Sequence, residues 1–472
     1  MLEAVGGNAD VSAGELAKSP PESLVVLGLA LSAFAVAILL GTNPQSSILA
    51  VVGFSVWLLL VWQTVVSRRA TSVLPALIVS ILLMMTGVGG FLLWKPGDGA
   101  SVVLELAPSA KIQAASLMVM SSLVVLSSAA VMAMLSPRLS WPRPQGLASG
   151  AVSVGPKFQS QLLSRVALGS VGLTIVGMGA QNIMYRSEYL EYPGGSSFAF
   201  RVAGLVAPVG LISAAALAAS DSLRHRRQGW VYVVALVALF VSQGSRRLAL
   251  APVLVLLGRM VVGKRPSKNS VAFVLVLSLL LIPLPLTFRS QDVNGLLPHL
   301  LALPEAVTAG GWRTLSSNLL FGYPLSAAVA FHQPKIPISA FWISINPLPG
   351  ELAGWYEISP SLRLNAFTPY SSIGELANYG AGILFAYLLS LGAVLVICAN
   401  SLRRVASRFD SETGKLLANA FLLGISVFVG LNLVQYNLRS STRVVYGLIA
   451  ICVLASAVSR IASARRSTLK GP

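Results

Sequence analysis

Long apolar segments are the feature of this sequence that most limits what it can fold into. A helix that crosses the hydrocarbon core of a bilayer needs about 20 apolar residues, with about 17 to 25 tolerated. The sequence therefore predicts an all-α polytopic integral membrane protein. We identify twelve candidate transmembrane helices, some of them short: 24–40, 48–66, 73–94, 114–135, 166–184, 198–219, 230–243, 248–262, 271–288, 377–399, 416–436 and 444–460.

The composition agrees with this class. Hydrophobic residues make up 55% of the chain and charged residues only 11%, which is typical of a membrane protein and not of a soluble one. The net charge of +18 could accompany nucleic-acid binding, but the basic residues lie in short clusters between apolar segments, as in cytoplasmic loops beside anionic lipid. Cys398 and Cys452 lie within apolar segments, so we expect no disulfide.

The distribution of basic residues predicts the orientation. With the N-terminus inside, 22 of the 34 Lys and Arg residues face the cytoplasm, as the positive-inside rule favours. We therefore predict that residues 1–23 form a cytoplasmic tail and not a signal peptide. The 136–165 loop and the 461–472 tail would also be cytoplasmic. Spans one to nine occupy 24–288, and spans ten to twelve occupy 377–460.

In this orientation residues 289–376 form one large external loop. The stretch from Arg289 to Asn378 contains two of the three histidines and five of the 16 Asp and Glu residues. Leucines from 296 to 301, and Trp312 with leucines from 315 to 320, recur at helical spacing. This pattern predicts interfacial helices within the loop. Any chemistry is expected beneath it.

Arginine dominates the basic residues on the predicted outer side. The planar guanidinium binds phosphate oxygens through two parallel hydrogen bonds, which lysine cannot copy. The pattern therefore indicates a phosphate-bearing ligand, although single arginines could also pair with outer carboxylates or lipid headgroups. Nine of the twelve outer basic residues are arginine: Arg186, Arg201, Arg246, Arg247, Arg289, Arg313, Arg363, Arg439 and Arg443.

The short hairpin around residue 245 strengthens this interpretation. Spans 230–243 and 248–262 each reach only roughly 21–23 Å at ~1.5 Å per residue, less than the ~30 Å hydrocarbon core. The tip from Gly244 to Arg247 is therefore expected below the outer headgroups, in a wet or ligand-filled cavity. Local thinning of the bilayer is the alternative. Arg201 fits the same cavity, or extends outward to the headgroups.

Motifs for metal or nucleotide chemistry are missing. The sequence has no nucleotide-binding Gly-rich loop after a strand, no CxxC, no HExxH and no Asp-x-Asp, so we expect neither metal nor cofactor. None of the 16 acidic residues lies within a predicted span, which argues against a proton-coupled transporter. The first outer loop, GTNPQSS, has no acid; many polyprenyl-phosphate-sugar transferases carry an acidic pair there.

The second half of the chain contains the motifs Gly244-Ser245-Arg246, INPLPG (345–350) and TPYSSIGELANYG (368–380), with Arg439 before the last span. These features resemble the Wzy-type polymerases, which join oligosaccharide repeat units into O-antigen, capsule and exopolysaccharide. Gly244-Ser245-Arg246 resembles the family's Gly-Ser/Thr-Arg hairpin, and the other two motifs resemble the segment after its large periplasmic loop. Arg439 is similar to a family arginine before the last span. The family's Arg-to-Gly spacing fits Arg363 and Gly374, but such spacing is common in a chain with 41 glycines.

The resemblance implies a location and a reaction. The protein would lie in the bacterial inner membrane with its active site in the periplasm, and a chain-length regulator is a possible partner. A glycan on undecaprenyl pyrophosphate would be transferred to the terminal sugar of another undecaprenyl-linked unit. Preorganised arginines can stabilise the leaving pyrophosphate without a metal. We assign Arg246 and Arg439 to catalysis, and pyrophosphate or glycan binding to Arg201, Arg247, Arg289, Arg363 and Arg443.

The acceptor hydroxyl also needs a base within hydrogen-bond reach. Glu375 is the first choice because it lies at the predicted junction of loop and helix, although the helix dipole favours an acid there in any case. His299 and His332 are second choices. A further group is assigned to contacts with sugar hydroxyls and ring faces: Glu351, Trp355, Tyr356 and Glu357.

Two other functions stay open. An O-antigen ligase uses the same donor but delivers the glycan to the lipid A core, and the family's His version of the spacing fits His299 and Gly310. A lipid-linked oligosaccharide flippase or other transporter is the second. A transporter would favour repeat symmetry and acidic residues within spans, and we see neither in the sequence.

Overall fold

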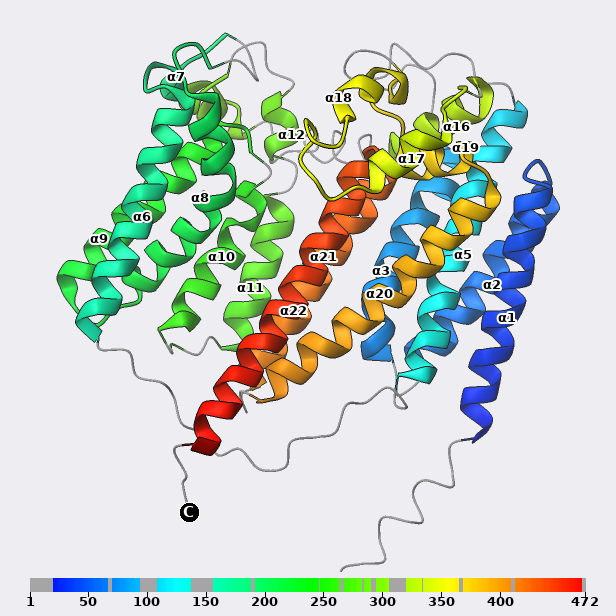
Figure 1. Cartoon of the computed structure of the whole chain (residues 1–472), viewed down its shortest axis with the longest axis horizontal. Helices are drawn as coiled ribbons and strands as arrows, with labels where there is room; N and C mark the ends of the chain where they lie inside the picture. The colour runs from blue at the N-terminus through cyan, green and yellow to red at the C-terminus, as the bar shows by residue number, and fades with distance from the viewer. Residues whose placement is uncertain are drawn as a thin grey trace, which may run out of the picture. The chain divides into compact units, whose positions relative to one another are not determined.

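The computed structural model describes most of the chain as helix (Figure 1). No strand occurs among the described residues, where the only pairings of extended chain are two isolated bridges, Arg186 with Asn294 and Arg363 with Pro369. The described residues are 20–66, 70–93, 108–136, 156–187, 192–245, 247–262, 264, 267–281, 284–289, 294–304, 320–332, 334–364, 368–408 and 412–468.

The chain forms two compact units, and the second is inserted into the first. Unit 1 consists of Met1–Ala148, Asn318–Asp410 and Leu417–Pro472, and unit 2 consists of Ser149–Ser317 and Ser411–Leu416. The large loop predicted over 289–376 is therefore divided between the units near residue 317. We describe each unit by itself.

Unit 1 contains the first and last helices of the chain. They are α1 (Pro20–Thr42), α2 (Ser47–Val66), α3 (Ala70–Met84), the π-helix η1 (Met85–Gly89), α4 (Gly90–Leu93), α5 (Pro108–Leu135), α16 (Gly322–His332), α17 (Ile338–Ile345), α18 (Trp355–Ile358), the 3-10 helix η2 (Ser359–Leu362), α19 (Ser372–Asn378), α20 (Ala381–Arg408), α21 (Glu412–Gln435) and α22 (Leu438–Thr468).

Unit 2 contains the middle of the chain. Its helices are α6 (Pro156–Met178), α7 (Gln181–Met184), α8 (Ser197–Ala218), α9 (Leu223–Ser242), α10 (Arg247–Val261), α11 (Lys268–Leu280), α12 (Leu284–Arg289) and α13 (Leu296–Leu301). The helix predicted from the leucines at 296–301 is thus present, whereas Trp312 and leucines 315 and 319 lie outside the described residues.

Every predicted apolar segment overlaps one or more helices, but not all of these helices can span a bilayer. Within the described residues, seven are long and apolar enough: α1, α2, α3 through α4, α5, α6, α20 and α22. The helix α8 is an eighth if its two parts, bent by 54° after Gly204, form one span. The bend has a cause, since Pro208 has no N–H to bond the Gly204 carbonyl four residues earlier. The chain is thus an all-α membrane protein, with seven or eight candidate spans in the part that the structure describes.

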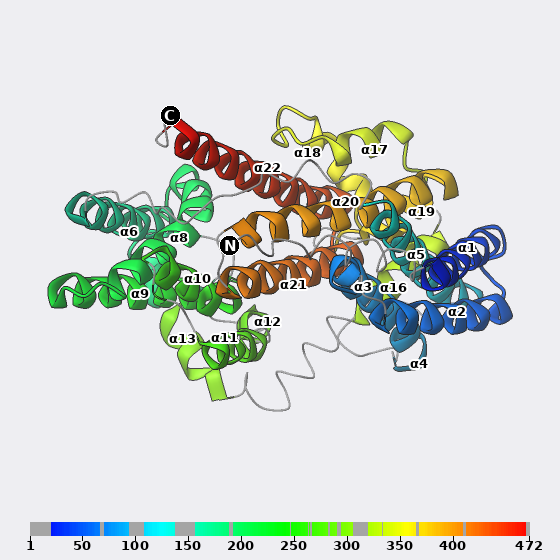
Figure 2. The ribbon, with the colours of Figure 1, turned by 90° about the horizontal axis from the view of Figure 1, so that it is seen from below.

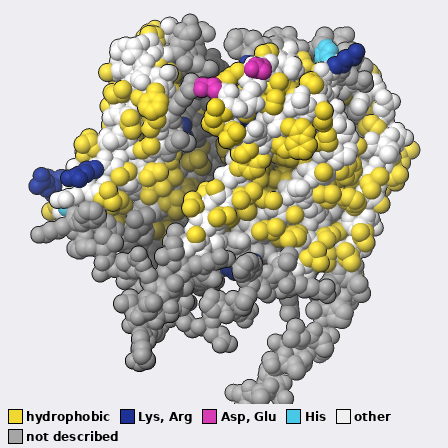
Figure 3. Space-filling view, in the orientation of Figure 1, with side chains coloured by type: hydrophobic (Ala, Val, Ile, Leu, Met, Phe, Trp, Pro, Cys, Tyr) yellow, Lys and Arg dark blue, Asp and Glu magenta, His cyan; other side chains and the backbone are white. Residues whose placement is uncertain are grey.

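Four predicted spans differ from this standard. In α21 only Phe421–Gln435 qualifies, as a shorter apolar helix. The helix α9 has 20 residues but begins with Arg224, Arg226 and Arg227, which extend it beyond the predicted start at 230. With 15 and 13 residues, α10 and α11 are short for a 30 Å core. The helix surfaces that face outward are nevertheless apolar, as the face in Figure 3 shows.

The helix α5 is the centre of unit 1. It packs against α1, α2, α3, α16 and α20 (Figures 1 and 2), and its many Ala and Ser residues allow these neighbours to approach closely. Hydroxyl groups join the helices: Trp57 Nε1 donates to Ser80 Oγ at 2.8 Å, and Ser122 Oγ donates to the Ser80 carbonyl at 2.8 Å. On the other side Ser128 Oγ donates to the Leu389 carbonyl of α20 at 2.6 Å.

The helix α8 has the same role in unit 2, where it packs against α6, α9 and α10. Glycines on the neighbouring helices make this possible. A Cβ on Gly229 would overlap the backbone of Ala218, and one on Gly258 would overlap that of Ile212. An ion pair between Asp221 and Lys264, at 2.6 Å, joins the α8–α9 and α10–α11 connections at one end of the unit.

The Gly-Ser-Arg hairpin has a local structural explanation. The helix α9 ends in a Schellman motif, with Gly244 N donating to the Val241 carbonyl at 2.9 Å and Ser245 N to the Phe240 carbonyl at 3.0 Å. Gly244 adopts φ +58°, a left-handed conformation that favours glycine. The helix α10 begins two residues after Ser245, whose carbonyl accepts from Leu248 N at 2.9 Å. The glycine and serine therefore end one helix and begin the next.

Candidate functional site

The residues that unit 1 brings together lie where α17, α19 and α22 meet. The N-terminus of α22 lies against α19 and α17. This junction contains Glu375 on α19 and Arg439 on α22, two of the three residues to which the sequence assigned catalysis. Both side chains are buried, with 0% and 3% exposure.

Glu375 is fully enclosed by hydrogen-bond donors. Its Oε1 accepts from Ser344 Oγ at 2.7 Å and from Tyr379 Oη at 3.2 Å. Its Oε2 accepts from the backbone N–H of Leu438 at 2.9 Å. Leu438 is the first residue of α22, so the carboxyl group satisfies one of the unpaired N–H groups of that helix. Glu375 thus joins α17, α19 and α22.

Burial and hydrogen bonding have opposite effects on the pKa of Glu375. Desolvation raises the pKa of this carboxyl above its ordinary value, while the bonds from Leu438, Ser344 and Tyr379 act to lower it. Desolvation is the larger effect. Burial, and to a smaller extent the adjacent carboxyl, also raises the pKa of Tyr379, so this phenol remains a donor to Glu375.

Arg439 is buried and is held by main-chain carbonyls. Its two terminal nitrogens donate to the Ile343 carbonyl at 2.6 Å and to the Leu348 carbonyl at 2.5 Å. The guanidinium carbon lies 5.2 Å from the centroid of the Trp355 ring, a cation–π geometry. Its Nε is buried and finds no hydrogen-bond partner in the described part of the chain. No carboxylate pairs with this guanidinium among the described residues.

These contacts connect the segments that carry the family resemblance. Leu348, in INPLPG, accepts from Arg439 and also from Arg443 at 3.2 Å. Glu375, in TPYSSIGELANYG, caps the helix that begins beside Arg439. Tyr446 Oη donates to the Ile345 carbonyl at 2.6 Å. Two of the three motif segments and the arginine therefore form one hydrogen-bonded cluster.

A second polar cluster lies inside unit 2, at the C-terminal end of α9. Arg186 donates to the Ser242 carbonyl at 2.7 Å, and its guanidinium carbon lies 4.9 Å from the centroid of the Tyr192 ring. His299 is fully buried, with Nδ1 2.6 Å from the Val241 carbonyl and its ring stacked 4.5 Å from that of Phe288. Burial lowers the pKa of His299, so we assign it as neutral.

This cluster neutralises the carbonyl end of a helix. The carbonyls of Val241 and Ser242 lie in the last turn of α9, and that of Val241 already accepts from Gly244 N in the Schellman motif. His299 lies against the Val241 carbonyl as a second partner, and Arg186 donates to the Ser242 carbonyl. The positive charge of Arg186 suits the negative end of the helix dipole. His299, considered at the sequence level as a base, thus lies in the interior and not on the loop surface.

The other predicted site residues are more scattered. Arg247 is half-buried, and a Cβ on Gly204 of α8 would lie 3.1 Å from one of its terminal nitrogens. Arg246 lies outside the described residues, as do the side chains of Arg201 and Arg289. Trp355 is half-buried in unit 1. The remaining predicted residues are exposed there: His332, Glu351, Tyr356, Glu357, Arg363 and Arg443.

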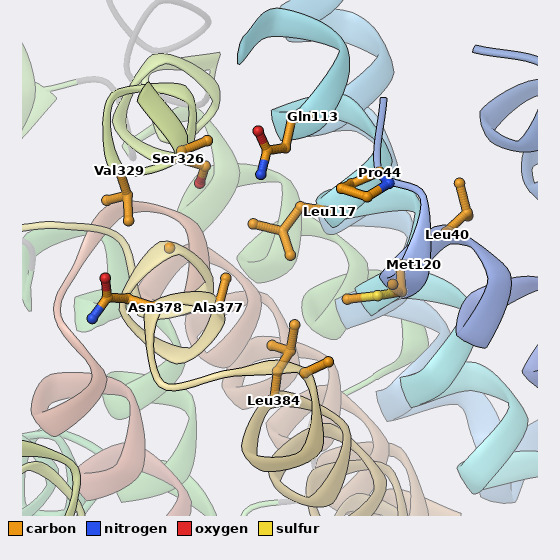
Figure 4. A pocket seen from close by; sticks show the side chains of 14 residues that line it. Leu40, Pro44, Gln113, Leu117, Met120, Ser326, Val329, Ala377, Asn378 and Leu384 are labelled. Atoms are coloured by element: carbon orange, nitrogen blue, oxygen red, sulfur yellow. The ribbon is translucent and has the colours of Figure 1, made fainter. Parts of the chain in front are cut away.

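A cavity of about 330 Å³ lies on the other side of α19 (Figure 4). Gly374, Ala377 and Asn378 of α19 line it, whereas Glu375 does not. One short helix therefore separates the cavity from the Glu375–Arg439 cluster.

Several residues of these sites carry no signal in the sequence. Ser344 and Tyr446 contribute hydrogen bonds to the cluster, and Gln113 and Asn378 line the cavity. Ser344, Tyr446 and Gln113 are ordinary polar residues within or beside an apolar segment, with no motif around them. Asn378 and Tyr379 lie inside the segment TPYSSIGELANYG, which the resemblance singled out.

Comparison of the chain with family models, curated proteins and solved structures finds no match. The resemblance therefore rests on the residues of the motifs and on their arrangement.

Proposed function

We propose that this protein is a glycosyltransferase that polymerises undecaprenyl-pyrophosphate-linked oligosaccharide units at the periplasmic face of a bacterial inner membrane. The acceptor hydroxyl oxygen attacks the anomeric carbon of the donor. The bond from that carbon to the pyrophosphate oxygen breaks, undecaprenyl pyrophosphate leaves, and the hydroxyl proton passes to a base. A chain-length regulator is the expected protein partner.

One observation carries the proposal. Segments that resemble the same family, although up to 91 residues apart, meet in one cluster through the bonds of Arg439 and Glu375. A buried guanidinium without a carboxylate partner is costly, and its Nε still has a donor to offer. A phosphate oxygen is a suitable acceptor, and Arg443, one turn along α22, is exposed to supply a second cation.

Two roles are open to Glu375 in this scheme. As a general base it must reach the acceptor hydroxyl directly or through one water. As a positioning residue it holds the N-terminus of α22, and with it Arg439, in place. Both of its oxygens are engaged and the residue has no exposed surface, which favours positioning in the ligand-free protein. Arg246 and Arg247 keep their sequence-based assignment as pyrophosphate ligands.

Lysine at position 439 tests the proposal. Arg439→Lys retains the charge but loses the planar fork, so the glycan ladder should collapse to single units. The same substitution also weakens the bonds to Ile343 and Leu348. A control must therefore distinguish loss of these structural hydrogen bonds from loss of a catalytic role. Tyr446→Phe removes a comparable bond to the neighbouring Ile345 carbonyl without touching a cation.

We expect Tyr446→Phe to keep a full ladder. Arg403→Lys is the matched arginine control, because Arg403 is also partly buried, with its terminal nitrogens unpartnered among the described residues. Protein level and thermal unfolding in detergent are measured for each variant. A full ladder from Arg439→Lys, or equal loss in Tyr446→Phe, would remove Arg439 from pyrophosphate binding.

The alternatives make different products. A ligase would place glycan on lipid A core, and a flippase would leave single units unpolymerised but translocated. The ligase alternative was based on the spacing of His299. This residue is buried, with both ring nitrogens beside protein oxygens, so it does not support the ligase function. Analysis of the lipid carrier in a deletion strain distinguishes all three functions.

A further inference from the structure

The cavity beside α19 has a lining that the transfer reaction does not explain. Its volume of about 330 Å³ lies within the ~300–1,000 Å³ range of ligand sites. Its wall comes from five helices: the C-terminal end of α1 with the turn after it, α5, α16, α19 and α20. The lining residues are Leu40, Gly41, Pro44, Gln113, Leu117, Met120, Ser326, Val329, Ala330, Gly374, Ala377, Asn378, Ala381 and Leu384.

The lining excludes several kinds of ligand. It contains no Lys, Arg, His, Asp or Glu, so a phosphate or carboxylate would be buried without an opposite charge, which is costly. It contains no aromatic side chain on which a sugar ring could pack. Most of the wall is aliphatic, with Leu117, Met120 and Leu384 among the larger side chains. A hydrocarbon chain suits such a wall.

Two side-chain amides give the cavity a polar part. Gln113 on α5 and Asn378 on α19 are half-buried and come from different helices (Figure 4). Neither amide is hydrogen-bonded to the part of the chain that the structure describes. The third polar residue, Ser326, is already bonded to Ser371 Oγ at 2.8 Å and to the Gly322 carbonyl at 3.0 Å. The amides can donate to and accept from a neutral hydroxyl or ester.

We propose that this cavity binds an uncharged lipid, with its hydrocarbon chain against the aliphatic wall and its neutral head hydrogen-bonded to Gln113 and Asn378. The cavity reaches the surface of unit 1, since Ala381 lines it and is exposed, so a lipid can enter from outside. This inference does not depend on the proposed glycosyltransferase activity.

Photolabelling of the full chain in phosphatidylcholine nanodiscs tests the inference. Three probes carry the same diazirine-bearing alkyl chain and end in an alcohol, in a carboxylate or in no polar group. The alcohol should label peptides that contain 113–120 and 374–384 more strongly than the carboxylate does. Labelling is mapped by mass spectrometry.

Two pairs of variants sharpen the result. Gln113→Leu and Asn378→Leu keep the size of the side chain and remove the amide, so each should reduce labelling by the alcohol about five-fold and leave labelling by the alkane unchanged. Ala377→Leu narrows the cavity and should reduce labelling by both probes. Ala386→Leu, on the exposed face of α20 away from the cavity, is its control and should change neither.

Two outcomes overturn the inference. The peptide around Leu58 and Trp62 faces lipid. If it is labelled as strongly as the cavity peptides, and no variant changes the labelling, the probes report only bulk lipid. Stronger labelling by the carboxylate would show an anion site. Circular dichroism and thermal unfolding confirm that the variants fold; if Ala377→Leu does not, the two amide variants decide alone.

Discussion

Glu375 and His299 show how much a residue's environment decides its chemistry. Both are titratable residues that sequence reasoning proposed as bases, and both have 0% exposure. Glu375 is held among three donors at the start of α22, and His299 completes the last turn of α9. Each satisfies a helix terminus, a role that residue type alone does not reveal.

The titration of Glu375 predicts a pH dependence of stability. Because burial raises the pKa of this carboxyl in the folded protein above its ordinary 4.5, the folded state binds more protons than the unfolded state. The free energy of unfolding should therefore fall as the pH rises from about 4.5 through the raised pKa. Glu375→Gln has no titrating group, so its Tm should vary less over this window.

Glu357→Gln is the matched control, since Glu357 is exposed on α18. Its Tm should follow the wild-type curve in detergent. A Glu375→Gln curve parallel to wild type would mean that the carboxyl does not titrate with a raised pKa. At neutral pH the same two variants separate base from positioning residue. A lost ladder with unchanged Tm favours the base, and a lost ladder with lowered Tm favours positioning.

At the scale of elements, helix ends carry most of the polar structure. The helix α9 ends in a Schellman motif, and Arg186 and His299 lie against the carbonyls of its last turn. The helix α22 begins with Glu375 at its first N–H and with Arg439 bonded to α17 and the segment after it. Gly244 and Arg439, which both belong to the segments that carry the resemblance, therefore lie at helix boundaries, where backbone groups need partners.

The Schellman motif gives a prediction for Gly244. The left-handed conformation costs a residue with a Cβ about 1–2 kcal/mol of free energy, and it costs asparagine less. Gly244→Ala should therefore lower the stability of the protein by about 1 kcal/mol, and Gly244→Asn should lower it less. Denaturant unfolding in detergent measures both.

Gly28→Ala is the control for this series. Gly28 lies in the interior of α1, and a Cβ there would meet no atom within 4 Å, so the change should be neutral or slightly stabilising. If Gly244→Asn abolishes the glycan ladder while the protein remains as stable as Gly244→Ala, the glycine is needed for close approach of a ligand and not only for the end of the helix.

At the scale of the molecule, the chain consists of two helical units, each built around one helix rich in small residues. The helices α5 and α8 occupy these central places. The insertion of unit 2 between α5 and α16 means that the predicted external loop is not one body. Its first part belongs to unit 2, and its second part contributes α16 to α19 to the site of unit 1.

The orientation of the chain is predicted from its basic residues and can be tested directly. In a background with Cys398→Ala and Cys452→Ala, a single cysteine is placed at Ser361 or at Ser222, both exposed positions. An impermeant thiol reagent applied to intact cells or spheroplasts should label Ser361→Cys only. After permeabilisation both should react. Labelling of Ser222→Cys alone in intact spheroplasts would reverse the topology.

The sequence by itself determined the class and the positions of the helices, because hydrophobicity and its period are local properties. Each of the twelve predicted segments overlaps at least one helix, although 166–184, 271–288 and 377–399 are divided between two, and both cysteines are free as expected. The number of helices able to span the bilayer is smaller than twelve among the described residues. Bends, charged turns and short lengths, which depend on neighbouring helices, decide that number.

Only the tertiary structure decided which polar residues meet. The bonds of Glu375 reach Ser344, 31 residues away, and Leu438, 63 residues away. The bond from Arg439 to Leu348 spans 91 residues. No local pattern encodes such pairs, since partner choice depends on how α17, α19 and α22 pack. For the same physical reason, the sequence placed His299 in an external loop, whereas the fold buries it. The sequence also did not predict that Gln113 and Asn378 line one cavity.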